Sequence, residues 1–531
     1  MRNTRVIDKH LAFAVGAVFA ASSAYAAFPS VLELSTLSGS NGVTFNGIDS
    51  ADHAGRSVAA AGDINGDGLA DLVIGAPDAD PNANFSGECY VVFGKNGVFS
   101  SPLSLSLLNG SNGFIIHGEA LFDGAGASVA AAGDINHDGF DDLLIGAPDA
   151  SASADFAGST YVVFGTDQGF ASPFELSSLD GTNGFVITGI AEYDASGTSV
   201  SGIGDFNDDG IDDLVIGAPF ASGGAGASYI VFGSALAWNA TFSLSDIDGN
   251  NGVTIVGQQS GDSLGTSVSR AGDVNQDGVQ DVVLGAPLAG PVGANPGFAY
   301  VIFGGDTWSA SFSLSSLDGS NGLVLTGAVT GDEFGTSVGA AGDLDADGID
   351  DLVVGAPKAD PNGNSSGATY VVFGSNAMPW SSPLAVGSLN GNNGFTVNGV
   401  SAGDESGYAV GRAGKLNADA FDDLVIGAPL ADPNGSASGS AYVLYGSDQV
   451  FASTIELSAL NGSNGFTLHG VTGNDRTGWS VGAAGDLNAD ARDDLVLGAP
   501  GDPGLLSAGI AYLVIDGASV DPDIIFANGF E

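Results

Sequence analysis

The chain is poor in basic residues. Its 531 residues include 11 Lys plus Arg against 62 Asp plus Glu, which gives a formal net charge of −51 at pH 7. Nucleic acids and anionic membrane surfaces are bound through clustered cations, so the composition argues against both as partners. The charged fraction is only 14% and the hydrophobic fraction is 44%, so the chain has enough apolar surface to bury a core.

Cysteine is represented by Cys89 alone, which excludes a framework of internal disulfides. Its counterparts in the internal repeats described below are all small residues. This favours a packed strand position for Cys89 over a catalytic thiol. The counterparts are Thr160, Ser228, Ala299, Thr369, Ala441 and Ala511.

Long apolar runs are also scarce. The run near the N-terminus, Leu11–Ala21, is shorter than the ~18–20 residues that span a bilayer. Three basic residues precede it, and the small-x-small pattern Ala24-Tyr25-Ala26 follows it. This arrangement predicts a secretory signal peptide over residues 1–26 rather than a short membrane anchor. We therefore expect an exported protein, extracellular, on the cell surface or in the periplasm, with no membrane span after cleavage.

What the chain does contain is a repeat. The stretch AAGDINGDGLADLVIGAP, Ala60–Pro77, recurs at spacings of 68 to 72 residues. The recurrence makes seven copies of one unit and fills nearly all of the chain after residue 26. The first position of the acidic loop falls at Asp63, Asp134, Asp205, Asp273, Asp343, Lys415 and Asp486.

Each copy carries four short segments rich in Val, Ile, Phe and Tyr and bounded by turn residues, which predicts four β-strands. The first segment of each copy is rich in Ala, Gly and Ser, and small side chains suit strands that crowd around an axis. Four strands repeated seven times predict an all-β, seven-bladed β-propeller over residues 27–517. In the first copy the segments are Ser57–Gly62, Asp71–Ala76, Tyr90–Phe93 and Phe114–His117.

The two ends of the repeat region are complementary. A fourth-strand segment, Asn41–Gly47, stands before any first strand, and the last copy stops after its third-strand segment, Ala511–Gly517. We therefore expect the N-terminal strand to complete the last blade, which would close the ring and remove an exposed sheet edge. The alternative is an open solenoid, but solenoids usually carry modified capping repeats.

The acidic loop has the pattern Asp-x-Asn/Asp-x-Asp-Gly-x-x-Asp. Side-chain oxygens come from positions 1, 3, 5 and 9, and position 7 can offer its backbone carbonyl. Oxygen-only ligands in a flexible loop suit Ca²⁺ better than Mg²⁺, which demands tighter octahedral geometry. A helix-flanked EF-hand is the competing interpretation, but it needs an acid at position 12. That position is apolar in every copy: Ile74, Ile145, Ile216, Leu284, Val354, Ile426 and Leu497.

Five loops are complete, so we predict about five calcium sites. The sixth loop has Lys415 at position 1 and Ala420 at position 6, which predicts an empty site. The seventh keeps its acidic positions but has Ala491 at position 6, which leaves it as an uncertain further site. The predicted ligands are Asp63, Asn65, Asp67, Leu69, Asp71; Asp134, Asn136, Asp138, Phe140, Asp142; Asp205, Asn207, Asp209, Ile211, Asp213; Asp273, Asn275, Asp277, Val279, Asp281; Asp343, Asp345, Asp347, Ile349, Asp351; and Asp486, Asn488, Asp490, Asp494.

Two Gly-x-Ser-x-Gly matches, at Ser337 and Ser480, resemble a nucleophile elbow. An elbow needs a strand-to-helix turn and a histidine partner, whereas these turns lead into the first strand of a copy. The histidines after residue 26 are His53, His117, His137 and His469, and repeat-derived structural roles explain them better than catalysis does. We predict no catalytic residues and a protein that is not an enzyme.

The acidic loop followed by LVIGAP, together with the Gly-x-Ser-Val turn in EFGTSV (Glu333–Val338), resembles the FG-GAP repeat of the integrin α-subunit β-propeller. The likeness is strongest to bacterial exported proteins made only of such repeats. It implies that the loop joins the first two strands of a blade and binds calcium. The final segment, Val520–Glu531, resembles short tails ending in IF-x-x-GFE, so residues 518–531 form a candidate sorting motif.

The resemblance also directs attention to the face opposite the calcium loops. Loops such as Asp78–Gly87 would emerge there, with aromatic residues in the fourth-to-first-strand loops. We expect an unknown protein or glycan ligand on this face, in cell-surface adhesion or binding. The alternatives are aromatics that merely pack between blades, and a propeller that acts as an enzyme or as an accessory module of an extracellular hydrolase. The aromatics are Phe122, Tyr193, Phe334, Tyr408 and Trp479.

Overall fold

A computed structural model describes residues 28–291, 294–417, 419–502, 504 and 506–515. The expected signal peptide, residues 1–26, and the candidate sorting tail, residues 518–531, lie outside these residues. All the strands and helices described below belong to one compact unit, Ala27–Ala518. None of its described helices has the length and hydropathy that a membrane crossing requires.

The first blade shows how the sequence builds one sheet. β3 (Ser57–Gly62), β4 (Asp71–Ala76), β5 (Glu88–Val92) and β7 (Gly113–His117) pair in that order, each antiparallel to the next. All residues of β4 and β5 are buried, and after the acidic first residue of each strand the side chains are apolar or small. The four strands lie within two residues of the predicted segments.

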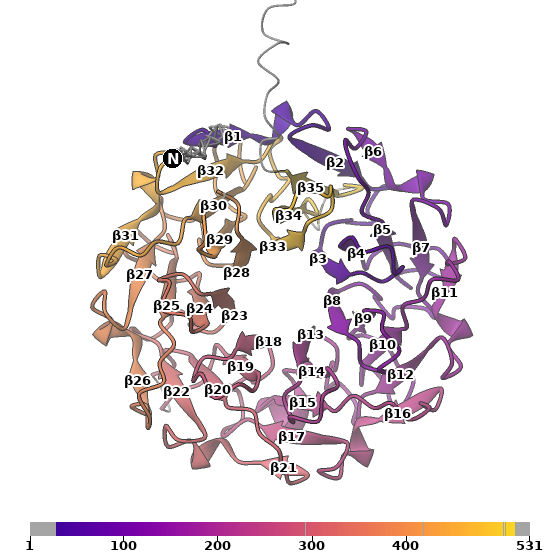
Figure 1. The fold of residues 1–531 in the computed structure, drawn as a ribbon, viewed down its shortest axis with the longest axis horizontal. Coiled ribbons are helices and arrows are strands. Elements are labelled where there is room, and N and C mark those ends of the chain that lie inside the picture. Colours follow the sequence, from indigo (N-terminus) through magenta and orange to yellow (C-terminus); the bar gives the residue numbers. More distant parts are fainter. Residues whose placement is uncertain (1–27, 292–293, 418, 503, 505, 516–531) are drawn as a thin grey trace, which may run out of the picture. The chain divides into compact units, whose positions relative to one another are not determined.

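Seven such sheets surround a central axis, and Figure 1 shows the strands labelled β3, β8, β13, β18, β23, β28 and β33 nearest that axis. The predicted seven-bladed propeller is therefore confirmed. From the axis outward, the four long strands of blades two to seven are β8 (Ser128–Gly133), β9 (Asp142–Ala147), β10 (Ser159–Val163), β12 (Gly184–Thr188); β13 (Ser199–Gly204), β14 (Asp213–Ala218), β15 (Ala227–Val231), β17 (Gly252–Val256); β18 (Ser267–Gly272), β19 (Asp281–Ala286), β20 (Phe298–Ile302), β22 (Gly322–Thr326); β23 (Ser337–Gly342), β24 (Asp351–Ala356), β25 (Ala368–Val372), β27 (Gly394–Asn398); β28 (Ala409–Gly414), β29 (Asp423–Ala428), β30 (Ser440–Leu444), β32 (Gly465–His469); and β33 (Ser480–Gly485), β34 (Asp494–Ala499), β35 (Ile510–Val514), β2 (Gly42–Asn46).

Each blade also has a fifth, outermost strand, which the sequence did not predict. For example, β11 (Phe174–Glu175) belongs to the connection inside blade two but pairs in parallel with β7 of blade one. In blades one to six, the connection between the third and fourth strands therefore adds an outer strand to the preceding blade and then continues into a short 3₁₀ helix. The remaining outer strands and these helices are β6 (Leu103–Ser104), β16 (Thr241–Ser243), β21 (Ser311–Phe312), β26 (Leu384–Ala385), β31 (Thr454–Glu456), η1 (Leu34–Thr36), η2 (Leu105–Leu107), η3 (Leu176–Ser178), η4 (Leu244–Asp246), η5 (Leu314–Ser316), η6 (Val386–Ser388) and η7 (Leu457–Ala459); a short α1 (Ala221–Gly224) lies in blade three.

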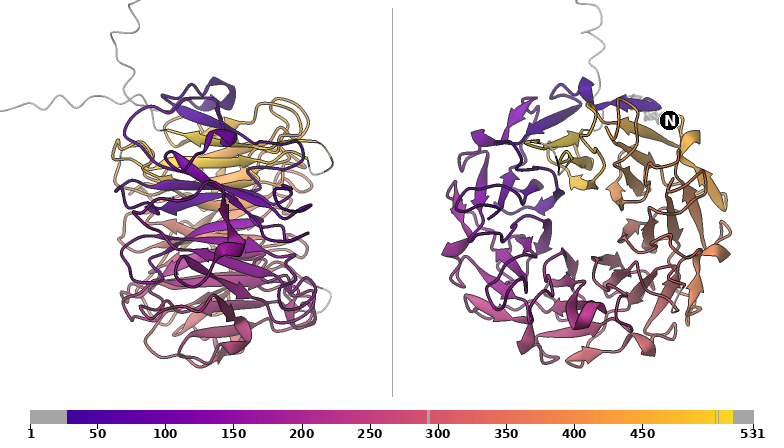
Figure 2. Two further views of the ribbon diagram at one scale, coloured as in Figure 1. Left: turned by 90° about the vertical axis from the view of Figure 1, so that its right-hand side faces the viewer. Right: turned by 180° about the vertical axis from the view of Figure 1, so that it is seen from behind.

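The N-terminal segment closes the ring at two places. β2 pairs antiparallel with β35, with Gly42 opposite Val514, so it completes blade seven as predicted. β1 (Val31–Glu33) pairs in parallel with β32, with Val31 opposite Thr467, and supplies the outer strand of blade six. Figure 2 shows from behind that the indigo N-terminal strands lie beside the yellow C-terminal blade.

The hydrophobic core is divided among the seams between blades. One cluster combines Val43 and Phe45 of β2 with Leu72, Ile74 and Tyr90 of blade one, all with 0% exposure. Six comparable clusters fill the other seams. Because strands alternate in direction, the turn between the first two strands of every blade opens on one face of the ring, here named the metal-loop face. The loops after the second and fourth strands open on the opposite face.

Candidate metal centres

The candidate metal loops occupy the turn between the first two strands of each blade. In blade one the pairing of β3 with β4 shifts between Ala60 and Gly62, which is a β-bulge. Gly62 then takes a φ of 73°, which a residue with a Cβ adopts at a cost, and directs Asp63 into the loop. The same shift recurs in all seven blades, so each loop leaves its first strand in the same way.

The carboxylate at position 1 organises the loop. In blade one, Asp63 Oδ1 accepts from the backbone N of Asp67 at 2.9 Å, and Asp63 Oδ2 accepts from Gly68 N at 2.8 Å. Asn65 Oδ1 accepts from the same Asp67 N at 2.9 Å. Gly68, at position 6, has a φ of 87°, which explains the glycine in the motif. The side chains of positions 1 and 3 are thereby gathered around the turn.

The carboxylate at position 9 is buried beneath the loop. Asp71 has 0% exposure; its Oδ1 accepts from Gly94 N at 2.8 Å and its Oδ2 from Ile64 N at 3.2 Å. Burial, together with the nearby carboxylates of Asp67 and Asp63, raises the pKa of Asp71 to about 8, and the two hydrogen bonds lower it only in part. Burial likewise raises the pKa of Asp142, Asp213, Asp281, Asp423 and Asp494 to about 8 and that of Asp351 well above its usual range.

A buried carboxyl beside other carboxylates is the environment in which a cation most favours the ionised form. The donor set of the loops consists of oxygen atoms, which fits the hard ion Ca²⁺. Loop five brings three carboxylate oxygens, from Asp343, Asp345 and Asp351, within 4.8 Å of one another. The other complete loops have asparagine at position 3, so an amide oxygen stands where Asp345 offers a carboxylate.

Position 7 was predicted as a backbone-carbonyl ligand. In each complete loop its N–H donates to the position-5 carboxylate, as Leu69 N does to Asp67 Oδ1 at 3.0 Å. These hydrogen bonds hold positions 5 and 7 close together. Ligation of a metal by the carbonyl of position 7 stays a prediction. The equivalent donors are Phe140, Ile211, Val279 and Ile349.

The sixth and seventh loops differ from each other. In loop one, Asp63 at position 1 accepts hydrogen bonds from the N–H groups of positions 5 and 6. Loop six has Lys415 at position 1, and a lysine side chain cannot accept these bonds. Loop seven keeps both bonds, because Asp486 accepts from Asp490 N at 3.1 Å and from Ala491 N at 2.9 Å. Ala491 has a φ of 69°, so this loop holds the required turn without glycine, at a cost in backbone strain. The geometry of loop seven is therefore closer to the complete loops than to loop six.

Position 8 was not singled out from the sequence, and it joins neighbouring loops. Asp141 Oδ2 in loop two accepts from Asp63 N of loop one at 2.7 Å. Asp212, Asp350, Asp422 and Asp493 make the equivalent bond to the loop before them. Position 8 is Gln280 in loop four and Ala70 in loop one, so two of the seven seams have no carboxylate there. The recurrence of aspartate in five copies was the signal that could have revealed this contact.

The serines and histidines considered for catalysis have structural contacts. Ser480 Oγ donates to Gly55 O at 3.1 Å, and Ser337 Oγ accepts from Val410 N at 3.1 Å, so both link neighbouring blades. His117 lies 3.2 Å from carboxylate oxygens of both Glu88 and Glu175. His469 contacts Glu33 of β1 at 3.0 Å. His137 occupies position 4 of loop two with a φ of 59°.

The five aromatics singled out in the loops of the opposite face divide into two groups. Phe334 has 0% exposure and packs against Tyr370, as the packing alternative predicted. Tyr408 and Trp479 contact each other with ring centroids 4.7 Å apart. Phe122 and Tyr193 are instead 48% and 61% exposed.

The repeat can now be compared with known proteins. The model of the FG-GAP repeat matches residues 54–92, 125–163, 196–231, 264–302, 334–372 and 477–514. The chain is an FG-GAP repeat protein. The copy left unmatched is the sixth, which carries Lys415.

The chain is similar to curated proteins of two groups. Phosphatidylinositol-glycan-specific phospholipase D is 27% identical over 401 residues in Homo sapiens, covering 69% of this chain and 42% of the relative. The Bos taurus protein of that name is 33% identical over 40% of this chain and 25% of its own length. Integrin alpha ina-1 of Caenorhabditis elegans is 30% identical over 51% of this chain and 24% of its own length. The chain thus aligns with less than half of each relative.

Proposed function

We propose that this FG-GAP protein is an exported, calcium-binding propeller without enzymatic activity that binds a protein or glycan ligand at the cell surface. The observation that carries the calcium part is the buried position-9 carboxyl, held among other loop oxygens in five complete loops. Loop seven is a sixth candidate because Asp486 keeps both of its backbone hydrogen bonds. Loop six lacks the position-1 carboxylate and binds no calcium.

Calcium would act by joining elements that the loop already brings together. Positions 1 and 9 lie at the ends of the first two strands, so one ion bound between them ties the inner hairpin of its blade. The hydrogen bond that Asp63 N donates to Asp141 Oδ2 connects this hairpin to the next blade. Cations would also offset the mutual repulsion of a chain with a formal charge of −51.

We assign ligand binding to the opposite face because its loops vary more between copies than the acidic loops of the metal-loop face do. An active site rarely recurs in five copies, so the acidic loops favour a structural role over catalysis. The alternative is an accessory module of a hydrolase, which the name of the phospholipase D relatives favours. Purified protein assayed against ester, phosphodiester and glycosidic substrates separates the two, since we expect turnover no faster than in the buffer control.

The calcium proposal is tested by melting the full exported chain in EDTA, in Ca²⁺ and in Mg²⁺, with the bound metal counted by elemental analysis. We expect a higher melting temperature in Ca²⁺ than in Mg²⁺ or EDTA, and about five ions per chain. An unchanged melting temperature together with no bound metal would reject the proposal.

The binding proposal is tested by fractionating cells and then probing surface extracts with the purified chain. We expect the protein outside the cytoplasm and a calcium-dependent, saturable interaction with a surface component. A cytoplasmic location, or no interaction in either Ca²⁺ or EDTA, would contradict it.

A further inference from the structure

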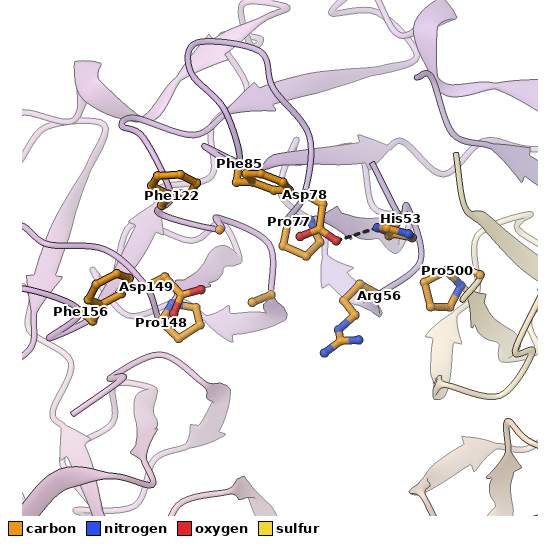
Figure 3. Close-up of a pocket in the computed structure, with 13 residues that line it drawn as sticks. His53, Arg56, Pro77, Asp78, Phe85, Phe122, Pro148, Asp149, Phe156 and Pro500 are labelled. Atoms are coloured by element: carbon orange, nitrogen blue, oxygen red, sulfur yellow. Dashed lines mark hydrogen bonds and ion pairs between the residues drawn. The ribbon is translucent and has the colours of Figure 1, made fainter. Parts of the chain in front are cut away.

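Two adjoining hollows lie on the opposite face, the first over blades seven, one and two and the second over blades two and three. The first has a volume of about 620 Å³ and is lined by Arg56, Asp78, Phe85, Phe122 and Asp149, among others. The second has a volume of about 780 Å³ and is lined by Asp149, Phe156, Tyr193 and Phe220, among others. Figure 3 shows the first hollow, with Phe85 and Phe122 along one side and Arg56 and His53 at the other end.

The hollows are built from equivalent positions of two copies. Asp78 and Asp149 each follow Gly-Ala-Pro after the second strand of their blade. The aromatic pair of the first hollow, Phe85 with Phe122, corresponds to Phe156 with Tyr193 in the second. The chain therefore presents the same combination, a carboxylate beside two aromatic rings, twice in succession.

The aromatic rings of each pair lie almost parallel and remain exposed. The ring centroids of Phe85 and Phe122 are 5.8 Å apart with 18° between planes, and those of Phe156 and Tyr193 are 5.7 Å apart with 13°. The four side chains are between 39% and 61% exposed, and Phe220 beside them is 60% exposed. Rings that pack only for stability would be buried, as Phe334 is.

The backbone of all four paired aromatics is in the left-handed region, with φ values of 54°, 65°, 53° and 64° in chain order. This region disfavours bulky side chains. In blades three to five the position of Phe122 is taken by Gly261, Gly331 and Gly403. Strain at exposed residues gains nothing in core packing, and such strain is typical of binding sites.

The loops are nevertheless held firmly. Phe122 N donates to Asn84 O at 3.0 Å, and Tyr193 N donates to Asp155 O at 3.0 Å. Each bond joins the loop after the fourth strand to the loop after the second strand of the same blade, so the two aromatics of a pair are fixed relative to each other. A ligand would meet preformed surfaces, which lowers the entropic cost of binding.

The charges in the hollows determine which ligand fits. Asp149, Glu192 and Asp194 line the second hollow, and its lining residues include no cation. The first hollow has Asp78 and Asp149, with Arg56 and the His53 Nδ1–Asp78 Oδ2 pair at 2.6 Å. The excess of carboxylates disfavours an acidic ligand and favours one that donates hydrogen bonds. Exposed ring faces favour a ligand with flat apolar faces.

A sugar ring combines those two properties, because its C–H groups form apolar faces and its hydroxyls donate at the rim. We infer that the two hollows bind a glycan chain without acidic groups, with sugar rings against the Phe85–Phe122 and Phe156–Tyr193 pairs and hydroxyls donating to Asp78 and Asp149. This inference rests on the proposed binding function and names the ligand class and the site within it.

The test uses the full exported chain in Ca²⁺, titrated with neutral hexasaccharides of glucose, mannose and N-acetylglucosamine and with an acidic alginate hexasaccharide. Phe122→Gly and Tyr193→Gly install the residue that other copies have at that position. Leu288→Ala, at the position of Phe220 in blade four and 42% exposed, is the matched control. We expect at least one neutral hexasaccharide to bind, with affinity at least 10-fold weaker in both glycine variants, unchanged in the control, and no binding of alginate.

The melting temperature of each variant distinguishes a structural role of the aromatics from a role in binding. If the aromatics are structural, the glycine variants melt at lower temperature; if they serve binding, melting is unchanged or raised because the strain at φ near 65° is relieved. Absence of neutral-glycan binding, preference for alginate, or equal affinity in all variants would overturn the inference. Capture of a surface protein lost in Phe122→Gly, with no glycan bound, would overturn the glycan assignment and leave the proposed function intact. A chain that captures nothing would overturn both.

Discussion

The two faces of the ring differ in how uniform their equivalent positions are from copy to copy. On the metal-loop face, position 9 is aspartate in all seven copies, and each of these carboxyls has 0% exposure. On the opposite face, the position of Phe122 holds an aromatic in two copies and glycine in three. A feature present in every blade solves a packing problem that every blade shares. An aromatic confined to blades one and two needs another cause, so stability should be tested on the first face and recognition on the second.

The largest expected effect is the response of the metal-free ring to pH. Burial raises the pKa of six of the seven position-9 carboxyls to about 8 in the folded chain and that of Asp351 well above its usual range, and each pKa returns to about 4 on unfolding. A raised pKa stabilises the fold at low pH, and this stabilisation is lost as pH rises from about 4 through 8. In EDTA we expect the melting temperature to be lower at pH 8.5 than at pH 5.5, by about 10 °C or more.

Calcium should abolish most of that fall, because a bound cation favours the ionised carboxylates. The measurement is a calorimetric scan at both pH values in EDTA and in excess Ca²⁺. A melting temperature that rises with pH in EDTA would show that the position-9 carboxyls are not the controlling groups.

A single complete loop can be broken with Asp343→Ala. This change removes a proposed calcium ligand and the acceptor of Asp347 N and Gly348 N. At free Ca²⁺ about 100 times Kd one site contributes about 2.7 kcal/mol, so we expect a loss of about 3 kcal/mol in Ca²⁺ and a smaller loss in EDTA. Urea unfolding in both conditions measures the difference. Lys415→Ala is the control and should respond equally in Ca²⁺ and EDTA.

The reverse change restores the loop that the sequence disables. Lys415→Asp with Ala420→Gly recreates positions 1 and 6 of the motif in blade six. We expect one additional calcium ion per chain and a Ca²⁺-dependent stabilisation of about 2 kcal/mol, slightly below a native site because the surrounding loop has not been selected for binding. Calcium titration by calorimetry counts the sites. An unchanged stoichiometry would mean that Lys415 is not what empties this loop.

The smallest effect concerns position 8. Asp141→Ala removes a hydrogen bond to Asp63 N and should cost about 1–2 kcal/mol, in EDTA as well as in Ca²⁺. At the closing seam the side chain of Ala70 lies beside Gly485 as Asp141 lies beside Gly62. Ala70→Asp should therefore supply the missing acceptor for Asp486 N and stabilise the ring by up to about 1 kcal/mol. Destabilisation by Ala70→Asp would show that repulsion from neighbouring carboxylates exceeds the new bond.

Much of this architecture could be predicted from the sequence because the repeat multiplies every signal. One stretch such as Asp71–Ala76 is ambiguous alone, but seven aligned copies establish the four strands and the loop between them. The same comparison identified Lys415 as a departure at position 1 of loop six. The complementary ends of the repeat predicted the pairing of β2 with β35.

What the sequence did not predict involves contacts between copies. β11 has two residues, too few for a periodic pattern, and it belongs to a different blade from its partner β7. Asp141 bonds to Asp63, one copy away, so its role is invisible within a single unit. Phe85 and Phe156 were overlooked because they stand in loops of variable length, where only the three-dimensional pairing with Phe122 and Tyr193 gives them meaning.

The double closure by β1 and β2 has a consequence for the order of assembly. Segment Val31–Asn46 supplies the outer strand of blade six and the fourth strand of blade seven, whose other strands lie more than 360 residues along the chain. Neither blade can be completed until those distant segments have been synthesised and brought together. Until then both blades present unpaired edges that could join another chain. Ring closure is therefore a late event in folding. Pairing with another chain is most favoured before closure, while these strand edges are unpaired.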